Sequence, residues 1–128
     1  MIPYDKYESF RNQADVSSLL AKNLVSSKAK DANLVFSPVS IHVLLGLIAA
    51  GSKGPTLNQL LSFLESKSTE ELNSLSSQLA TLVFTDGGPL GGPRLSFANG
   101  VWVDQSLSLK PTFKEIVHNA YEAAARSC

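Results

Sequence analysis

The chain has two histidines, His42 and His118, which are its most obvious candidates for proton-transfer chemistry. A Ser/His/Asp site needs a histidine that takes the proton of a neighbouring serine, and either histidine could in principle serve. The G-x-S-x-G pattern that exposes a nucleophilic serine is absent from the sequence. Because a histidine in an apolar helical stretch is more often a hydrogen-bonded interior residue, we predict no catalytic residue and no enzymatic activity.

Residues 46–53 resemble a phosphate-binding loop, the pattern G-x-x-x-x-G-K-[ST]. Here the lysine, Lys53, follows the hydroxyl residue Ser52, which is the reverse of the required order. A phosphate loop also follows a strand and opens a helix, whereas this segment is predicted to close one. We therefore predict no nucleotide cofactor.

Four charged residues lie close together at Glu65, Lys67, Glu70 and Glu71. Carboxylates at the start of a helix usually interact with the positive end of the helix dipole and with water, so we predict capping and solvation here. The single cysteine, Cys128, has no partner for an internal disulfide or a metal site. The sequence therefore predicts no metal and no cofactor.

Composition and charge indicate one ordinary globular unit with no charge-driven partner. The 128 residues are 44% hydrophobic and 17% charged, and 11 basic residues balance 11 acidic ones. No net field favours nucleic acid or an anionic membrane surface, and no apolar run reaches the ~18 residues needed to span a bilayer. The N-terminus lacks the apolar core of a secretory signal, which predicts a cytoplasmic protein.

The first elements that position these residues are two helices separated by a short strand. Apolar residues at helical spacing predict a helix from Tyr7 to about Lys28, and the β-prone residues 33–36 predict a short strand. Ser37 and Pro38 then provide an N-cap hydroxyl and a first-turn proline for a helix over residues 39–50. This second helix is apolar nearly all round, so we expect it to run through the interior of its parent fold, with Gly51 closing it in the left-handed conformation.

Two capping patterns predict the next two helices. Thr56 and Gln59 have the spacing of a capping box, as do Ser68 and Glu71. Basic residues, which would bind a polyanion, are absent between residues 68 and 84. The fourth helix carries an apolar stripe at three- and four-residue steps, formed by Leu72, Leu75, Leu79, Leu82 and Val83.

The last third of the chain is predicted to hold a loop, a strand and a fifth helix. Residues 86–94 are rich in glycine and proline and predict a mobile loop. Residues 95–104 alternate as a half-buried strand does, but Asn99-Gly100 is also a strong hairpin signal, and the local pattern leaves both forms open. Pro111 begins an apolar helical face, and one strand of a main sheet is expected without neighbours.

Several of these segments together resemble the serpin family, most closely its plant members. The residues that carry the resemblance are 33–41 (NLVFSPVSI), 49–56 (AAGSKGPT), 59–61 (QLL), 95–104 (LSFANGVWVD) and 110–113 (KPTF). The resemblance covers nearly the whole chain. It implies an α+β serpin fold fragment, mostly helical with five helices, a short strand and one strand of the central sheet, so that residues 1–128 form a partial serpin domain.

The resemblance also implies a function and a set of structural residues. Serpins inhibit serine proteases, and less often cysteine proteases, by inserting a cleaved reactive loop into the central sheet. The resemblance favours a straight strand through Asn99-Gly100, and it matches Asn33, Ser37, Pro38 and Ser40 to the shutter, where the sheet parts over the second helix. For this chain alone, simple capping by Ser37 and a small interior residue at Ser40 are the preferred interpretation.

The reactive loop of the family lies beyond the segment matched here, so we expect it to be absent and the chain alone to be non-inhibitory. The alternative function is an interaction module that self-associates or pairs its exposed strand with a full-length serpin or another sheet protein. The resemblance also adds an alternative location, the extracellular space, as for many serpins.

Overall fold

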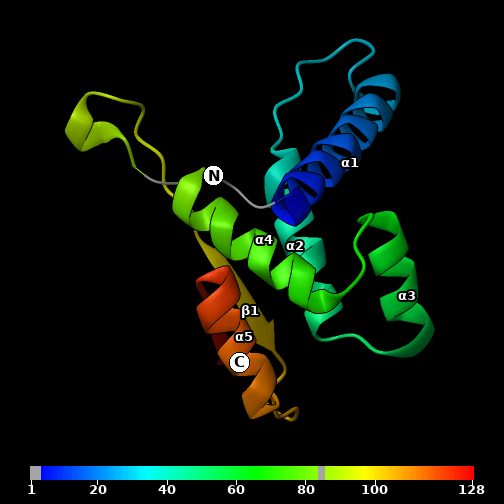
Figure 1. Ribbon diagram of the computed structural model, residues 1–128, viewed down its shortest axis with the longest axis vertical. Coiled ribbons are helices and arrows are strands. Elements are labelled where there is room, and N and C mark those ends of the chain that lie inside the picture. The colour runs from blue at the N-terminus through cyan, green and yellow to red at the C-terminus, as the bar shows by residue number, and fades with distance from the viewer. Residues whose placement is uncertain (1–3, 84–85) are drawn as a thin grey trace. The chain divides into compact units, whose positions relative to one another are not determined.

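The computed structural model of the chain describes residues 4–83 and 86–128, except for the side chain of Asp5. The chain divides into two compact units, Met1–Glu71 and Leu72–Cys128. Five α-helices and two β-strands lie in the described part. Figure 1 labels the five helices and the first strand.

Three helices make up the first unit: α1 (Tyr4–Lys28), α2 (Pro38–Ala50) and α3 (Gly54–Phe63). Helix α2 contacts both α1 and α3, so it is the centre of this unit (Figure 1). The fully buried apolar side chains come from α1, from α2 and from the residue that follows α3. They are Val16, Val43, Leu47, Ala49 and Leu64.

The structure of this chain buries only one side of α2, whereas the sequence predicted a position in the interior of the parent fold. Leu44 is 43% exposed and Ile48 is 55% exposed, and these residues are one turn apart on the same face. One side of the helix is therefore open to solvent in the described residues, and its interior position in the parent fold remains a prediction. The left-handed conformation predicted for Gly51 was wrong, since Gly51 caps the helix with φ −94°.

The predicted strand at residues 33–36 does not form, and the described chain runs there as a loop. A strand needs a neighbouring strand to pair its backbone groups, and the described sheet has only two strands, both later in the chain. Val35 is 96% exposed, as expected for a residue without a sheet or core to cover it.

Helix α3 begins two residues before its predicted cap. Lys53 is the N-cap residue without a side-chain hydrogen bond, Gly54 has a left-handed φ of +59°, and Pro55 lies in the first turn. Thr56 therefore lies inside the helix and cannot act as its cap, so that prediction was wrong. Proline's fixed φ favours a start at this point over one at the hydroxyl residue.

Helix α4 (Thr69–Leu82) begins at the end of the first unit and continues into the second. Ser68 caps it as predicted, because its hydroxyl accepts a hydrogen bond from the Glu71 N–H at 3.2 Å. The predicted apolar stripe is buried only at Leu72, Leu75 and Leu79, whereas Leu82 is 67% exposed. Phe84, which the prediction placed at the end of this segment, lies outside the described residues.

The loop at residues 86–94 contains a short 3₁₀ turn, η1 (Gly88–Leu90). Backbone hydrogen bonds close it: the Gly92 N–H donates to the Gly87 carbonyl at 2.8 Å and the Gly87 N–H donates to the Pro93 carbonyl at 3.2 Å. Gly91 has φ +79°, a conformation that favours glycine. The segment is therefore a defined turn, and the predicted mobility remains a prediction.

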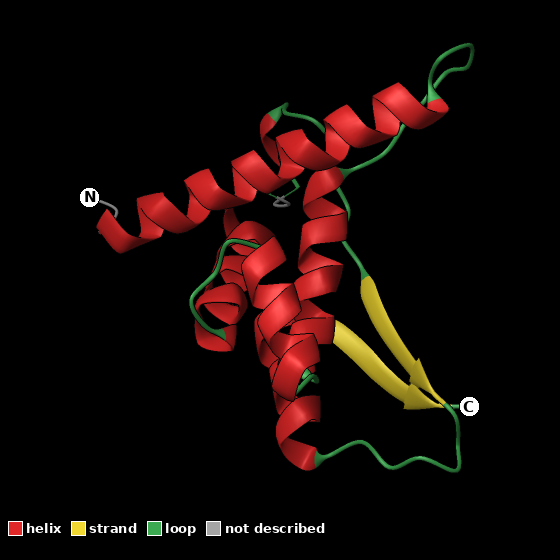
Figure 2. Cartoon of the chain, turned by 90° about the vertical axis from the view of Figure 1, so that its right-hand side faces the viewer, coloured by secondary structure: helices red, strands yellow, loops and turns green. Residues whose placement is uncertain are grey.

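The second unit ends in a strand, helix, strand arrangement: β1 (Asn99–Val103), α5 (Pro111–Tyr121) and β2 (Ala123–Ser127). The strands pair in parallel, with Asn99 opposite Ala123 and Val103 opposite Ser127, and they lie side by side in Figure 2. Helix α5 contacts β2. A helix is the usual connection for parallel strands, because a short turn cannot bring the chain back to its starting edge.

The parallel pair corrects two predictions about this segment. The strand at residues 95–104 is not alone, since β2 is its neighbour, and it is shorter than predicted. Asn99 and Gly100 are the first two residues of β1, so the hairpin alternative was wrong and the straight strand implied by the serpin resemblance is confirmed.

Gly100 lies directly beneath the side chain of Trp102 on the exposed face of β1. A Cβ atom added at Gly100 would collide with the far end of the indole ring. Trp102 is 68% exposed, so its ring has space to move away. A larger residue at position 100 is therefore accommodated by a shift of the ring rather than of the strand.

We expect Gly100→Ala to alter the fluorescence of Trp102, the single tryptophan, while changing the free energy of unfolding by no more than about 1 kcal/mol. Displacement of the ring into water shifts its emission to longer wavelength and raises its quenching by acrylamide. Ala98→Gly, outside the strand, is the control. An unchanged spectrum in Gly100→Ala would show that the ring does not rest on the glycine in solution.

Candidate functional site at the start of helix α2

The residues matched to the shutter lie at the N-terminus of α2 and in the loop before it. Ser37 is the N-cap with extended backbone angles, φ −114° and ψ 104°, and Pro38 is the first helical residue, as predicted. The Ser37 hydroxyl accepts a hydrogen bond from the Ser40 N–H at 3.3 Å and another from the Ser40 hydroxyl at 2.9 Å. The cap thus satisfies one of the free backbone donors of the helix start.

Asn33 does not take part in this arrangement. Its side chain is exposed in the loop, and no hydrogen bond of the described chain joins it to Ser37 or Ser40. The structure therefore brings together three of the four predicted residues. In this chain their geometry is that of a helix cap with a small neighbouring hydroxyl.

Ser37→Ala is expected to lower the free energy of unfolding by about 1 kcal/mol, because the cap hydrogen bond to the Ser40 N–H is lost. The matched control is Ser52→Ala, at the other end of α2, where the hydroxyl only bonds back to the Ile48 carbonyl at 2.7 Å. Urea unfolding followed by circular dichroism measures both. Equal losses in the two variants would contradict a capping role for Ser37.

His42 lies one turn after the cap and is almost fully buried, at 1% exposure. Its Nε2 atom has no hydrogen-bond partner in the described chain. Burial away from water lowers the pKa of His42 below its ordinary value, so the ring is neutral at pH 7. The predicted interior position is correct, but the hydrogen bond expected of an interior histidine is missing at Nε2.

The other residues with chemical potential are placed as surface groups. His118 is exposed on α5, and Cys128 is a free, exposed thiol. Residues 46–53 form the end of α2 and the turn after it, so they make no phosphate loop. Within residues 4–83 and 86–128, no three His, Cys, Asp or Glu side chains are grouped so that they could hold a metal ion.

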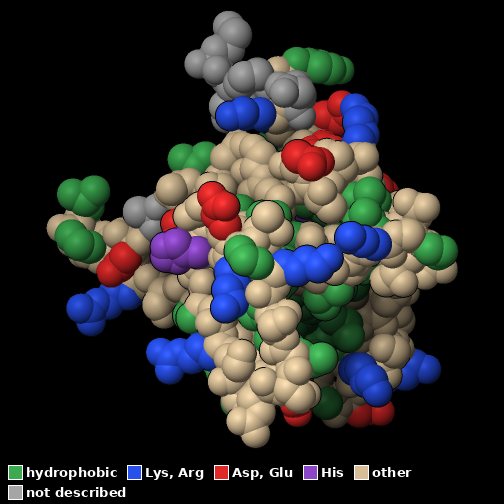
Figure 3. All heavy atoms as spheres, turned by 90° about the horizontal axis from the view of Figure 1, so that it is seen from below, with side chains coloured by type: hydrophobic (Ala, Val, Ile, Leu, Met, Phe, Trp, Pro, Cys, Tyr) green, Lys and Arg blue, Asp and Glu red, His purple; other side chains and the backbone are tan. Residues whose placement is uncertain are grey.

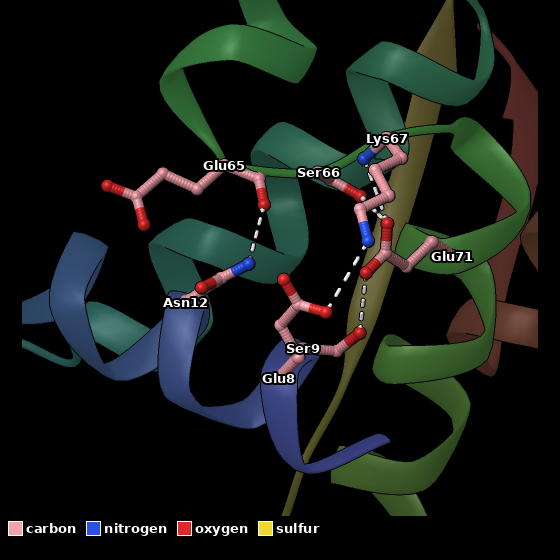
Figure 4. Close-up of polar contacts among 7 residues, drawn as sticks. All are labelled: Glu8, Ser9, Asn12, Glu65, Ser66, Lys67 and Glu71. Carbon is pink, nitrogen blue, oxygen red and sulfur yellow. Dashed lines mark hydrogen bonds and ion pairs between the residues drawn. The ribbon is translucent and has the colours of Figure 1, made fainter. Parts of the chain in front are cut away.

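A polar cluster around Glu71 was missed by the sequence analysis and is drawn in Figure 4. Glu71 Oε1 accepts a hydrogen bond from the Ser9 hydroxyl at 2.6 Å, and Oε2 accepts from the Ser66 hydroxyl at 3.0 Å and the Lys67 N–H at 2.8 Å. Lys67 Nζ in turn lies 3.4 Å from Glu8 Oε2. Glu71 was predicted to cap and be solvated, and no sequence pattern connects it to residues so distant in the chain.

The surface carries charges of both signs. Figure 3 shows Lys and Arg side chains interspersed with Asp and Glu side chains on the face that it draws, with hydrophobic side chains between them. No α4 residue is basic. In the described part of the chain, no helix has the length and apolar character needed to cross a bilayer.

Comparison with known proteins explains this arrangement of helices and parallel strands. The profile of the family described as Serpin (serine protease inhibitor) matches residues 11–128. The chain belongs to the serpin family. The predicted resemblance is therefore confirmed, and serpins are protease inhibitors rather than enzymes.

The relatives of this serpin chain include several plant proteins. Serpin-ZX of Arabidopsis thaliana is 49% identical over 121 residues, which is 94% of this chain and 31% of the relative. Serpin-Z2B of Triticum aestivum is 50% identical over 95 residues, which is 74% of this chain and 24% of the relative. Another Arabidopsis relative, 43% identical over 94% of this chain, is named Probable non-inhibitory serpin-Z5.

Solved serpin structures share the fold of this chain. Arabidopsis AtSerpin1 in its native stressed conformation matches with a TM-score of 0.87 and 46% identity, covering 99% of this chain and 32% of AtSerpin1. Cleaved Serpin 42Da matches with a TM-score of 0.77 at 22% identity, which supports the fold alone. The chain thus spans about a third of the length of these serpins, and it corresponds to their N-terminal portion.

Proposed function

We propose that this chain forms the N-terminal portion of a serpin-type serine protease inhibitor. The observation that supports the proposal is the match to AtSerpin1, a native stressed serpin, over 99% of the chain at a TM-score of 0.87. In this proposal α2 is the helix over which the central sheet parts, and β1 is one strand of that sheet. Ser37, Pro38 and Ser40 have a mechanical role at the start of α2.

We further propose that the 128 residues alone do not inhibit a protease. Inhibition by loop insertion needs an exposed reactive loop and a sheet wide enough to receive it. The described residues contribute a sheet of only two strands, and the chain spans 32% of AtSerpin1. The stored strain that drives insertion therefore has to come from residues beyond those matched here.

The test is to incubate the purified chain with trypsin and with chymotrypsin, using a full-length inhibitory serpin as the positive control. We expect no SDS-stable complex and no loss of protease activity at tenfold molar excess of the chain. A covalent complex containing these 128 residues would overturn the proposal of non-inhibition.

A second candidate function is an interaction module that pairs through its small sheet. Two observations favour it: each strand of the β1–β2 pair has an outer edge without a partner strand in the described chain, and Trp102 is 68% exposed beside one of them. Open edges with apolar side chains recruit other strands. The partner in this proposal is a second copy of the chain or a full-length serpin.

Pull-down of a full-length serpin by the tagged chain tests this second function. Trp102→Lys places a charge beside the strand edge and is expected to reduce capture at least tenfold, since a charged edge opposes strand addition. Asn119→Lys, at an exposed position on α5, adds the same single positive charge away from the strands and is the control for the change of net charge. Equal capture by the chain and both variants would contradict pairing through this sheet.

A further inference from the structure

The polar cluster around Glu71 connects α1 to the segment between α3 and α4. Three α1 residues within about one turn reach this segment: Glu8, Ser9 and Asn12, and Figure 4 shows them side by side. Ser9 bonds to Glu71, Glu8 pairs with Lys67, and the Asn12 amide donates to the Glu65 carbonyl at 3.0 Å. Each contact joins residues more than fifty positions apart within the first unit.

The start of the segment is closed by backbone hydrogen bonds to α3, since the Glu65 N–H donates to the Ser62 carbonyl at 3.2 Å and the Ser66 N–H donates to the Leu61 carbonyl at 3.0 Å. Glu65 adopts a left-handed φ of +51°, which is uncommon for a residue with a side chain. Its neighbour Leu64 is 1% exposed, so the connection is fixed to the core at one end by an apolar side chain. Asn12 and Glu71 hold the following residues, because they bond to the Glu65 carbonyl and the Lys67 N–H.

Glu71 binds its three hydrogen-bond donors, Ser9, Ser66 and the Lys67 N–H, as a negatively charged carboxylate. An ionised carboxylate only accepts hydrogen bonds, and each of its three partners here is a donor. Burial raises the pKa of Glu71. The opposite effect is larger in sum and comes from the hydrogen bonds of Ser9, the Lys67 N–H and Ser66 and from the Lys67 charge, so the net pKa is below the ordinary value. The carboxylate is therefore ionised at neutral pH.

We propose that Glu71 is a charge-dependent clasp that holds α1 to the α3–α4 connection, residues 64–68, and that loss of its charge releases this connection. Protonation converts one oxygen into a donor, which faces the hydroxyl of Ser9 or the donors Ser66 and Lys67. The other ionisable groups around it are Glu8 and Lys67, which pair with each other, and the exposed Glu65 and Glu70.

The pH dependence has a definite sign. Because the folded-state pKa of Glu71 is depressed, the clasp is closed above the ordinary carboxyl pKa and opens as the pH falls through the lower folded value. Glu8 and Lys67 reinforce the closed form through an exposed ion pair, which salt screens. Opening is local, since the apolar contact of Leu64 remains.

Glu71→Gln and Glu70→Gln are a matched pair for testing the clasp in the full 128-residue chain. Both remove one negative charge from the first turn of α4, but Glu70 is exposed and makes none of the contacts to α1. By hydrogen exchange at pH 7, Glu71→Gln is expected to raise exchange of the Lys67 amide, which donates to Glu71, and of amides in the first turns of α1 about tenfold. Exchange in Glu70→Gln is expected to stay within about twofold of the unmodified chain.

A lower pH and the removal of the Ser9 hydroxyl give the second readout. After correction for intrinsic exchange rates, the unmodified chain and Glu70→Gln should lose protection of the Lys67 amide as the pH falls through the lowered folded pKa of Glu71, whereas Glu71→Gln should already lack it at pH 7. Ser9→Ala should loosen the first turns of α1 while the Lys67 amide stays protected.

The proposal is wrong if the Lys67 amide exchanges alike in the two glutamine variants. It is also wrong if Glu71→Gln loses its helical circular dichroism as a whole, because the clasp predicts a local opening. A clear difference between the variants with retained helix content supports it.

Discussion

Replacing Leu79 with alanine is expected to lower the free energy of unfolding by about 2–5 kcal/mol. Leu79 is 2% exposed in α4 and is the last leucine of the buried part of the apolar stripe. Truncation removes the transfer energy of the side chain and leaves a cavity, because the surrounding side chains relax only in part. Since a small domain is stable by only about 5–15 kcal/mol, this single change can remove much of its stability.

Leu82→Ala is the matched control for this prediction. Leu82 follows Leu79 by three residues in the same helix but is 67% exposed, so its removal leaves no cavity and should change stability by less than about 0.5 kcal/mol. Urea unfolding monitored by circular dichroism measures both variants. Similar losses at the two positions would show that α4 is not packed in solution as the structure has it.

Replacing His42 with leucine is expected to raise the free energy of unfolding at pH 7 by about 1–3 kcal/mol, because the buried Nε2 atom has no hydrogen-bond partner. A leucine side chain has a similar volume and no polar atom to desolvate. The comparison variant is His118→Leu, where the histidine is exposed on α5 and the change should be near zero.

The same histidine gives the chain a pH dependence. Its folded-state pKa is lowered from 6.5 by burial, so the unfolded chain takes up a proton more readily than the folded one. Stability is therefore complete above pH 6.5 and falls as the pH drops below that value, until the folded pKa is reached. His42→Leu should remove this slope and His118→Leu should retain it, and a slope that persists in His42→Leu would contradict the assignment.

Local sequence patterns predicted the elements best where the determinants are close in sequence. Ser37 and Pro38 start α2 as predicted, Ser68 caps α4, and Pro111 begins α5. Caps and proline positions depend on a few neighbouring backbone groups. The cap predicted at Thr56 was wrong because the same helix begins two residues earlier, at Gly54 and Pro55.

Strand β2 could not be predicted because its own residues do not indicate a strand. Residues 123–125 are three alanines, which favour helix and show no apolar alternation. The segment becomes a strand because Glu122, with φ +47°, ends α5 and because β1 lies beside it. Residues 33–36 show the opposite case, where β-prone residues form no strand because no neighbour pairs with them.

The sequence predicted only those parts of the candidate site whose residues are close together in the chain. Ser37, Pro38 and Ser40 form the expected cap, but nothing in the sequence indicated that Asn33 stays apart from it. The contact of Glu71 with Ser9 joins residues 62 positions apart, and such pairs depend on how α1 packs. Their distance in sequence explains why a pattern search could not find them.

The parallel pairing of β1 and β2 also has a consequence for synthesis on the ribosome. The β2 partner of each β1 residue is synthesised about two dozen positions later. At typical elongation rates of about 5–20 residues per second, that interval lasts about 1–5 seconds. During this time Trp102 and its neighbours emerge as an unpaired apolar segment, which is the kind of sequence that chaperones bind.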